Sequence, residues 1–453
     1  MKTMTRAAAV ARENNQRSIE RLVKLVRTPS PTGEEGSAQA LIAGWLQELG
    51  ADVVMAEPDI KAMFESYPEI AQYPTHWQHD LVLPYEQLPS YEALHASGLE
   101  EVLNYRGRPN VTGVLRGTGG GRSLVLNAHI DTVTIEPAER WTRAPYGAEI
   151  ADGLLYGRGT SDMKGGLVAA LMALQFLREA GVTLRGDVIF QSVVNEEHSG
   201  NGTLDLVRRG LKADAAIVLE PTDNQIFVSH PGGLYWQLKT AGVPRSPGAR
   251  WNNGVQEGVS AIELLPSAIR ALLDVEKGFN QAHAHGIHRP FSLVIGKVAG
   301  GHYETVTADE ALLRGGAYFA PEVGDVGDVM QRFSQAVHAA NRDDPLLNRH
   351  PARFEFLHHD DSTQQSEDIA IAVSMGEVLA DRGRDGQRYL GPFCCDARHL
   401  VNQGGIPTII FGPGTIAQAH KPDEHIRVDD FLASIELLAE FIERWCNQDA
   451  AGA

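Results

Sequence analysis

Cysteine is scarce in this chain, with three residues in 453. Cys394 and Cys395 are adjacent and Cys446 stands alone, so the sequence contains neither a disulfide framework nor the two CxxC pairs of a zinc ribbon. This usage is typical of a reducing compartment. The N-terminus has no apolar segment of the kind found in signal peptides, and no run of about 18 apolar residues occurs anywhere. We therefore expect a cytoplasmic protein with no membrane partner.

Basic residues are also fewer than acidic ones. Lys and Arg total 40 against 58 Asp and Glu, which gives a formal net charge of −18. Such a surface disfavours the phosphate backbone of nucleic acids and anionic lipid headgroups, so we predict no nucleic-acid partner. A small-molecule substrate remains compatible with this charge. The glycine-rich segment 117–122 lacks the GK[ST] ending of a phosphate-binding P-loop, and we interpret it as a hairpin turn between two strands.

The length predicts roughly two or three domains, since one core serves about 100–200 residues. The first 56 residues have helical periodicity, and after Val111 strands alternate with helices, which indicates an α/β layer with a mostly parallel sheet. From Gly232 the order becomes β-α-β-β-α-β, the ferredoxin-like α+β unit. We expect two domains. Residues 1–231 and 362–453 would form a catalytic domain, which contains an irregular insertion at 57–108. Residues 232–361 would form a second domain inserted into the first.

Polar side chains that could bind metal or take part in catalysis follow the predicted strands. His129 and Asp131 lie at the end of an apolar strand, two residues apart, so their side chains point the same way on an extended chain. A carboxylate in this position can accept the second N–H of a metal-binding histidine, although a purely structural His–Asp pair fits equally well. Asp162 precedes a predicted helix, where it could also serve as the N-cap.

Two further strands end in carboxylates. Glu196 and Glu197 follow the apolar strand 187–194, and adjacent buried carboxylates are costly without a cation or a proton. Glu220 ends the next apolar strand, and His420 follows the strand at 406–412. Two histidines and three carboxylates suit a two-metal hydrolase with a shared bridging carboxylate. The remaining glutamate would act as the general base.

Five motifs together make the chain recognisable: NAHIDTV, GRGTSDMKGG, NEEHSGNG, LEP and a late AH pair. The sequence resembles the M20 family of metallopeptidases and amidohydrolases over about residues 17–50 and 110–445. The resemblance implies two divalent metal ions, with zinc as the default and manganese or cobalt as alternatives. It also implies that the inserted domain is a lid that forms a homodimer.

The resemblance assigns roles to single residues. His129 and Glu220 would hold one metal ion and Glu197 and His420 the other, with Asp162 bridging them. Glu196 resembles the general base and Asp131 the residue that orients His129. The family pattern also implies a cis peptide bond between Asp162 and Met163.

The inserted domain departs from the family. No histidine occurs in segment 241–263, where the family carries one that contacts the substrate carbonyl, and Ser246 stands near that position. Arg245 or Arg250 could replace it, or could be solvated in a Pro/Gly-rich loop. Glu304 and Tyr318 stand where the family has Asn and Arg. The substrate-binding candidates are Arg245, Arg250, Arg289, His302, Tyr318, Arg398 and Gly414.

These observations predict a metal-dependent hydrolase that cleaves an amide C–N bond of a small molecule, with Glu196 as general base and an unusual substrate. One alternative is hydrolytic deamination of an aromatic or conjugated amine at the same site. A second is a non-catalytic binding protein on this scaffold. Such a protein would be expected to have lost a metal ligand or the base, but all six of these residues are present.

Overall fold

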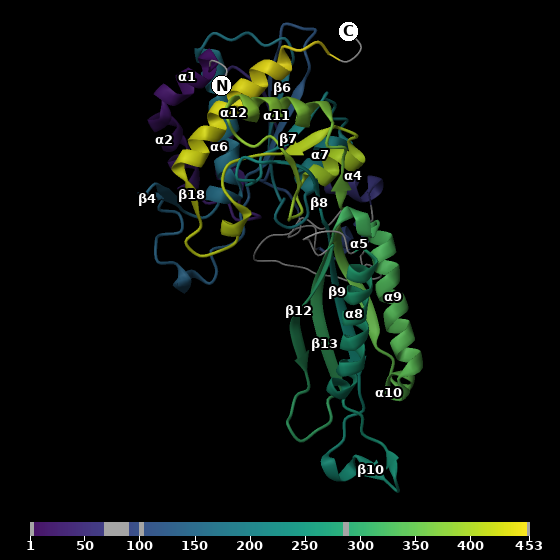
Figure 1. The fold of residues 1–453 in the computed structure, drawn as a ribbon. Coiled ribbons are helices and arrows are strands. Elements are labelled where there is room, and N and C mark those ends of the chain that lie inside the picture. Colours follow the sequence, from purple (N-terminus) through teal and green to yellow (C-terminus); the bar gives the residue numbers. More distant parts are fainter. Residues whose placement is uncertain (1–3, 68–89, 99–103, 284–289, 451–453) are drawn as a thin grey trace. The chain divides into compact units, whose positions relative to one another are not determined.

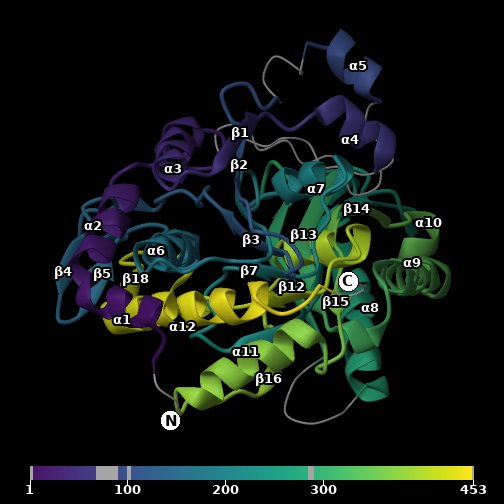
Figure 2. The same cartoon turned by 90° about the horizontal axis from the view of Figure 1, so that it is seen from above.

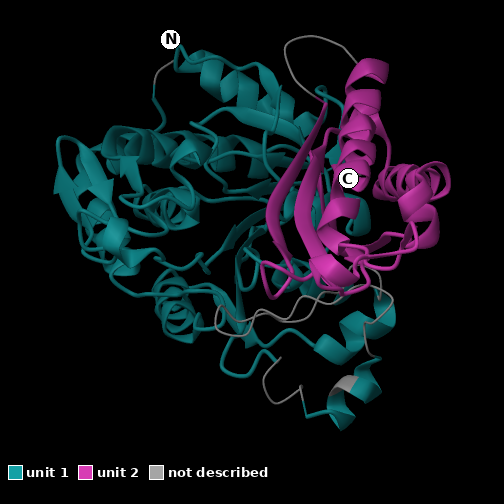
Figure 3. Cartoon of the chain, turned by 90° about the horizontal axis from the view of Figure 1, so that it is seen from below, with its two compact units in different colours: residues 1–81, 90–230, 363–453 teal, residues 82–89, 231–362 magenta. Residues whose placement is uncertain are grey.

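The computed structural model describes residues 4–67, 90–98, 104–283 and 290–450. The chain divides into two compact units (Figure 3). Unit 2 contains the continuous stretch Pro231–Ser362, and unit 1 contains the described residues before and after it. Among the described residues, no helix is long and apolar enough to cross a membrane.

Unit 1 is built around a mixed sheet, and its described strands lie in the order β1-β2-β6-β3-β7-β17-β8-β15, with β16 beside β8. The four central strands β6, β3, β7 and β17 are mutually parallel, and the pairs on either side are mostly antiparallel. All six residues of β3 are buried, as expected for a strand covered on both faces. The strands are β1 (Asp52–Ala56), β2 (Asn110–Leu115), β3 (Leu124–His129), β6 (Val188–Val193), β7 (Ala216–Val218), β8 (Ile226–His230), β15 (Thr363–Gln364), β16 (Arg388–Leu390) and β17 (Thr408–Ile410).

Helices cover this sheet, and α6 (Gly165–Glu179) is the most deeply buried of them. It packs against α12 (Val428–Cys446) and α1 (Arg6–Glu13), which lie beside it in Figure 2. A Cβ atom on Gly166 would lie 1.9 Å from the carbonyl oxygen of Leu219, so glycine allows the start of α6 to approach the end of β7. The other helices of unit 1 are α2 (Asn15–Val26), α3 (Gly36–Glu48), α4 (Ile60–Ser66), α5 (Tyr91–Ala96), α7 (Asn201–Arg208) and α11 (Ala370–Asp381).

A small antiparallel sheet accompanies the main one. It contains β4 (Glu149–Ala151), β5 (Leu154–Tyr156) and β18 (His425–Arg427), in the order β18-β5-β4. Because β18 immediately follows the loop of His420, this sheet anchors one end of that loop.

Unit 2 has a four-stranded antiparallel sheet in the order β12-β13-β9-β14 (Figure 1). In its core, Trp236 of the sheet contacts Phe333 of a long helix, and the Phe333 and Phe354 rings stack at 5.6 Å between centroids. The elements are β9 (Gly232–Ala241), β10 (Trp251–Asn252), β11 (Val255–Gln256), α8 (Ala261–Ala282), β12 (Phe291–Gly300), β13 (Glu310–Phe319), α9 (Val326–Asp343), α10 (Pro345–Arg349) and β14 (Arg353–Asp360). The predicted fold class, an α/β domain with a ferredoxin-like unit inserted, is confirmed.

Two local predictions are wrong. The first 56 residues are not all helical, because β1 forms the edge of the main sheet. The glycine-rich segment 117–122 is not a hairpin turn, because β6 lies between β2 and β3. Its glycines serve close packing instead: a Cβ atom on Gly117 or Gly121 would lie 2.3 or 2.1 Å from a backbone oxygen. Much of the expected insertion at 57–108 lies outside the described residues, and the described part contains α4 and α5.

Candidate metal centre

The carboxyl ends of three adjacent parallel strands meet at one edge of the main sheet. His129 is the last residue of β3, Glu196 and Glu197 follow β6, and Glu220 follows β7. An open α/β sheet binds ligands at this edge because parallel strands deliver their C-terminal loops to the same place. Sequence position alone therefore brings an imidazole and three carboxylates together.

Two loops complete the cluster by carrying Asp162 and His420 to this edge. The Nε2 atom of His129 lies 3.1 Å from Asp162 Oδ1 and 3.8 Å from Glu220 Oε1. The Nε2 atom of His420 lies 3.3 Å from Asp162 Oδ2 and 2.9 Å from Glu197 Oε2. Each oxygen of Asp162 thus faces a different histidine, which is the arrangement that a carboxylate bridging two cations requires.

Two groups of donor atoms in this cluster are close enough together to hold a metal ion. One contains His129, Asp162 and Glu197, and the other His129, Glu196 and Glu220, with all ligand atoms within 4.8 Å of one another. Glu196 lies 3.9 Å from His129 Nε2, slightly beyond Glu220. Imidazole nitrogen and carboxylate oxygen are the ligands that zinc and related divalent ions prefer, so the donor set fits the expected ions.

The hydrogen bonds of His129 orient its ring toward the carboxylates. Its Nδ1 atom lies 2.8 Å from the backbone oxygen of Asp131. A carbonyl oxygen only accepts, so Nδ1 carries a proton and Nε2 is the nitrogen presented to the cluster. The backbone of Asp131 therefore does what we expected of its side chain, since Asp131 Oδ1 lies 3.8 Å from Nδ1.

The Asp131 carboxylate has a different task. It accepts hydrogen bonds from the backbone N–H groups of Glu196 and Glu197, at 3.1 and 3.2 Å, and from the hydroxyl of Thr32 at 2.9 Å. It thereby holds the turn that carries the two glutamates. The carboxylate also lies 3.8 Å from His129 Nδ1, and its expected role in orienting His129 stays a prediction.

Burial makes the cluster electrostatically unfavourable without cations. Burial raises the pKa of the Glu196 and Glu220 carboxyl groups well above the ordinary value, and neighbouring carboxylates raise it further. The charge of Glu197 raises the pKa of His420 to about 11. Burial lowers the pKa of His129, but Asp162, Glu220 and Glu196 outweigh it and raise the pKa well above its usual range. The cluster therefore attracts positive charge, which divalent ions can supply in place of protons.

The resemblance also implied a cis peptide bond between Asp162 and Met163, and the structure contains it. Asp162 does not act as a helix N-cap through its side chain, because α6 begins three residues later and has no side-chain cap bond. Both carboxylate oxygens of Asp162 face histidines instead.

Sequence reasoning missed the buried ion pairs behind the cluster. Arg108 binds both oxygens of the fully buried Glu35 at 2.7 and 2.8 Å and donates to Asn195 Oδ1 at 3.0 Å. Asn195 directly precedes Glu196 and has a positive φ of 64°. A second buried pair joins Arg158 to Glu424. Neither pair has a motif of its own, because each joins residues far apart in the sequence.

Two substrate-binding candidates lie in unit 1, at structurally demanding positions. Arg398 is buried and donates to the backbone oxygen of Cys395 at 3.0 Å. Gly414 has a φ of 85°, and a Cβ atom there would lie 2.5 Å from the hydroxyl of Ser161. These contacts explain why the two positions tolerate few substitutions.

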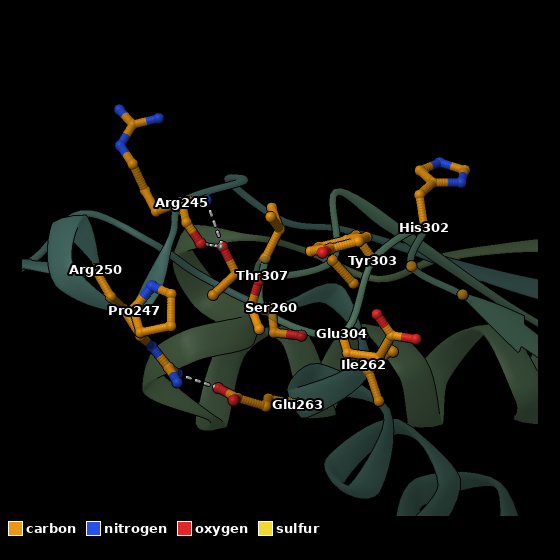
Figure 4. A pocket seen from close by; sticks show the side chains of 15 residues that line it. Arg245, Pro247, Arg250, Ser260, Ile262, Glu263, His302, Tyr303, Glu304 and Thr307 are labelled. Atoms are coloured by element: carbon orange, nitrogen blue, oxygen red, sulfur yellow. Dashed lines mark hydrogen bonds and ion pairs between the residues drawn. The ribbon is translucent and has the colours of Figure 1, made fainter.

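Three other candidates line one open pocket of roughly 560 Å³ in unit 2: Arg245, Arg250 and His302 (Figure 4). The guanidinium of Arg250 forms an ion pair with Glu263, while that of Arg245 points away from the other labelled side chains. Tyr318 lies on β13, apart from this pocket lining, and is 42% exposed. Arg289 lies outside the described residues.

Comparisons with known proteins identify the family of the chain. Residues 125–444 match the family model "Peptidase family M20/M25/M40", and the chain belongs to this family. It is 30% identical over 365 residues to N-formyl-4-amino-5-aminomethyl-2-methylpyrimidine deformylase of Halalkalibacterium halodurans, covering 76% of this chain and 84% of that one. It is 28% identical over 353 residues to acetylornithine deacetylase of Salmonella typhimurium, covering 76% and 86%.

The fold agrees as well. A tripeptidase from Staphylococcus aureus superposes with a TM-score of 0.70 at 21% identity, covering 96% of this chain and 99% of that one. The predictions of the family and of an enzyme belonging to it are confirmed.

Proposed function

We propose that this protein is a binuclear metal-dependent amidohydrolase that removes a small acyl group, such as formyl, from the amine of an aromatic or heteroaromatic small molecule. The observation that carries the proposal is the cluster in which Asp162 turns one oxygen to His129 and the other to His420. The acyl and amine parts are supported by the 30% identity to a deformylase whose substrate name is an aminomethylpyrimidine.

The residues divide the chemistry between them. His129 and Glu220 would hold one ion, Glu197 and His420 the other, and Asp162 both. Two bound divalent ions, zinc by default or manganese or cobalt, would acidify a water molecule and polarise the amide carbonyl. Glu196 would take the proton from the attacking water and deliver it to the departing nitrogen, because its carboxyl group lies at the cluster, 3.9 Å from His129 Nε2.

The departures in unit 2 support a substrate without the amino-acid carboxylate. Glu304 and Tyr318 stand where the resemblance implies the Asn and Arg that hold such a carboxylate, and Arg250 is already paired with Glu263. An arginine engaged in an ion pair is a weaker anchor for a second carboxylate. A neutral aromatic amine as the leaving group is compatible with this arrangement.

We also propose that the protein is a cytoplasmic homodimer assembled through unit 2. Among the described strands, β12 is at the edge of its sheet, with Val294 55% exposed and Val298 66% exposed. An edge strand with exposed valines is prone to pair with another strand. Three free cysteines support a reducing compartment. Sedimentation of the purified protein tests the dimer.

The activity is tested by mass spectrometry of products from zinc- or manganese-loaded protein. The substrates would be N-formyl and N-acetyl derivatives of aminomethylpyrimidines, N-acyl amino acids, dipeptides and free aromatic amines. We expect formate or acetate and a free aromatic amine, with Glu196→Gln as the inactive control. Preferential cleavage of acyl amino acids would overturn the substrate class. Release of ammonia from a free aromatic amine would indicate a deaminase, and no turnover with any compound by fully loaded protein would favour a binding protein.

A further inference from the structure

Glu424 is a fully buried carboxylate that no motif drew attention to. Its Oε1 atom accepts hydrogen bonds from the backbone N–H groups of Ser161 and Asp162, at 2.9 and 3.1 Å. Its Oε2 atom accepts from the backbone of Gly159 at 3.0 Å and from the Arg158 guanidinium at 2.7 Å. Every one of these four donors belongs to the turn that carries Asp162.

The same glutamate belongs to the loop that carries His420. This loop is attached to the Asp162 turn at both ends. At its start, Ser161 Oγ accepts from the Thr415 backbone N–H and donates to the Thr415 oxygen, both at 3.0 Å. At its end, the Glu424 carboxylate makes the four bonds above, and its backbone oxygen accepts from Gly157 N–H at 2.8 Å.

His420 needs such support because of its own conformation. It has a φ of 61°, in a left-handed region of backbone conformation that residues other than glycine adopt only at a cost in free energy. Its ring is 54% exposed, so packing contributes less to holding it than it does for the buried His129. The attachments at Thr415 and Glu424 therefore do much to determine where the imidazole stands relative to Asp162.

We propose that Glu424 is a positioning residue of the metal centre that sets the separation of Asp162 and His420 by binding the turn of one from the loop of the other. The inference rests on the proposed function in that the cluster is taken to hold metal ions. Residues behind metal ligands commonly change metal affinity or activity 10–100-fold when they are replaced, so the effect is measurable.

The test is a titration of chelator-treated full-length protein with cobalt, followed by the visible absorption of the ion. The variant is Glu424→Gln, which keeps size but places an amide N–H against backbone donors that need an acceptor. The matched control is Glu440→Gln. Glu440 is also fully buried and bonded to arginines, Arg382 and Arg444, but it lies on α12 and contacts neither loop.

We expect Glu424→Gln to weaken cobalt binding about tenfold or more and to change the absorption spectrum, while Glu440→Gln binds cobalt as the wild type does. A folded Glu424→Gln protein with wild-type cobalt affinity and spectrum would overturn the inference. Equal weakening in Glu440→Gln would overturn it too, because the effect would then come from lost stability.

If Glu424→Gln does not fold, Ser161→Ala provides the second variant. It removes the hydroxyl that joins the other end of the loop, and we expect weaker cobalt binding and an altered spectrum. An unchanged titration would contradict the proposed positioning. The outcome is separable from that of the proposed function: a wild type that binds two cobalt ions but cleaves no amide disproves the activity and leaves the positioning test intact.

Discussion

The metal centre of unit 1 and the pocket of unit 2 differ in how their charged side chains are exposed to solvent. In the metal centre of unit 1 most of the charged side chains are buried and have specific partners, as do Asp131, Asp162 and Glu424. In unit 2 the charges of the pocket are largely exposed: the His302 side chain is 73% exposed and lies 3.6 Å from Asp309. Buried charges are retained only with strong compensation, whereas exposed ones need none. The comparison teaches that the charged residues of the metal centre are fixed by specific partners, whereas those of the unit 2 pocket are less constrained.

The largest effect is expected from Asp162→Ala. Both histidines face this carboxylate, so its loss removes a ligand from both ions at once. We expect metal affinity to fall by more than about 100-fold, beyond the usual effect of residues behind the ligands, and activity to be lost. Metal analysis after gel filtration checks this. Retention of both ions would show that Asp162 does not bridge.

Glu196→Gln should separate catalysis from metal binding. We expect turnover to fall about 10²–10⁴-fold, the usual contribution of a general base, with both ions retained. Steady-state kinetics and metal analysis of the same preparation measure both. Glu20→Gln, an exposed glutamate of α2, is the matched control and should behave as the wild type. Near-normal turnover would remove Glu196 from the role of base, and loss of an ion would make it a ligand instead.

The same contrast explains what could be predicted from the sequence. His129, Glu196, Glu197 and Glu220 could be found because each follows an apolar strand, and parallel strands deliver such residues to one edge. Glu424 could not, since the segment around it is polar and its partners lie more than 250 residues earlier. Strand alternation gives the direction of the Asp131 side chain but not the position of the turn after β6, so its bonds to the backbone of Glu196 and Glu197 could not be predicted.

The fold shows the same limit. The β-α-β-β-α-β order of unit 2 could be predicted because its strands and helices are long and periodic. Three-residue strands such as β7 and β17 carry little periodicity, and the insertion of β6 between β2 and β3 is a long-range pairing that local patterns do not encode. The turn-like composition of segment 117–122 therefore suggested a hairpin that does not exist.

Phe333→Ala tests whether the two units can be perturbed separately. Phe333 is fully buried between Trp236 and Phe354 in the core of unit 2. Its removal should lower the free energy of unfolding of unit 2 by about 3–5 kcal/mol, as for other buried aromatic residues. Urea denaturation measures the loss, and cobalt titration should remain unchanged. The control is Gln335→Ala, on the exposed face of α9. If Phe333→Ala also lost cobalt affinity, the stability of unit 2 and the metal centre of unit 1 could not be perturbed separately.

The smallest effect is expected from Arg250→Gln. Arg250 is paired with Glu263 near the surface, and exposed ion pairs contribute about 0.2–1 kcal/mol to stability. If the pocket of unit 2 does not hold substrate, kcat/KM should change by less than about fivefold, the equivalent of 1 kcal/mol. The double variant Arg250→Gln with Glu263→Gln removes the pair without leaving a lone charge and should match the single one. A rise in KM of tenfold or more at constant kcat would show that this half-buried arginine contacts the substrate, and the charged residues of the unit 2 pocket would then also be constrained by function.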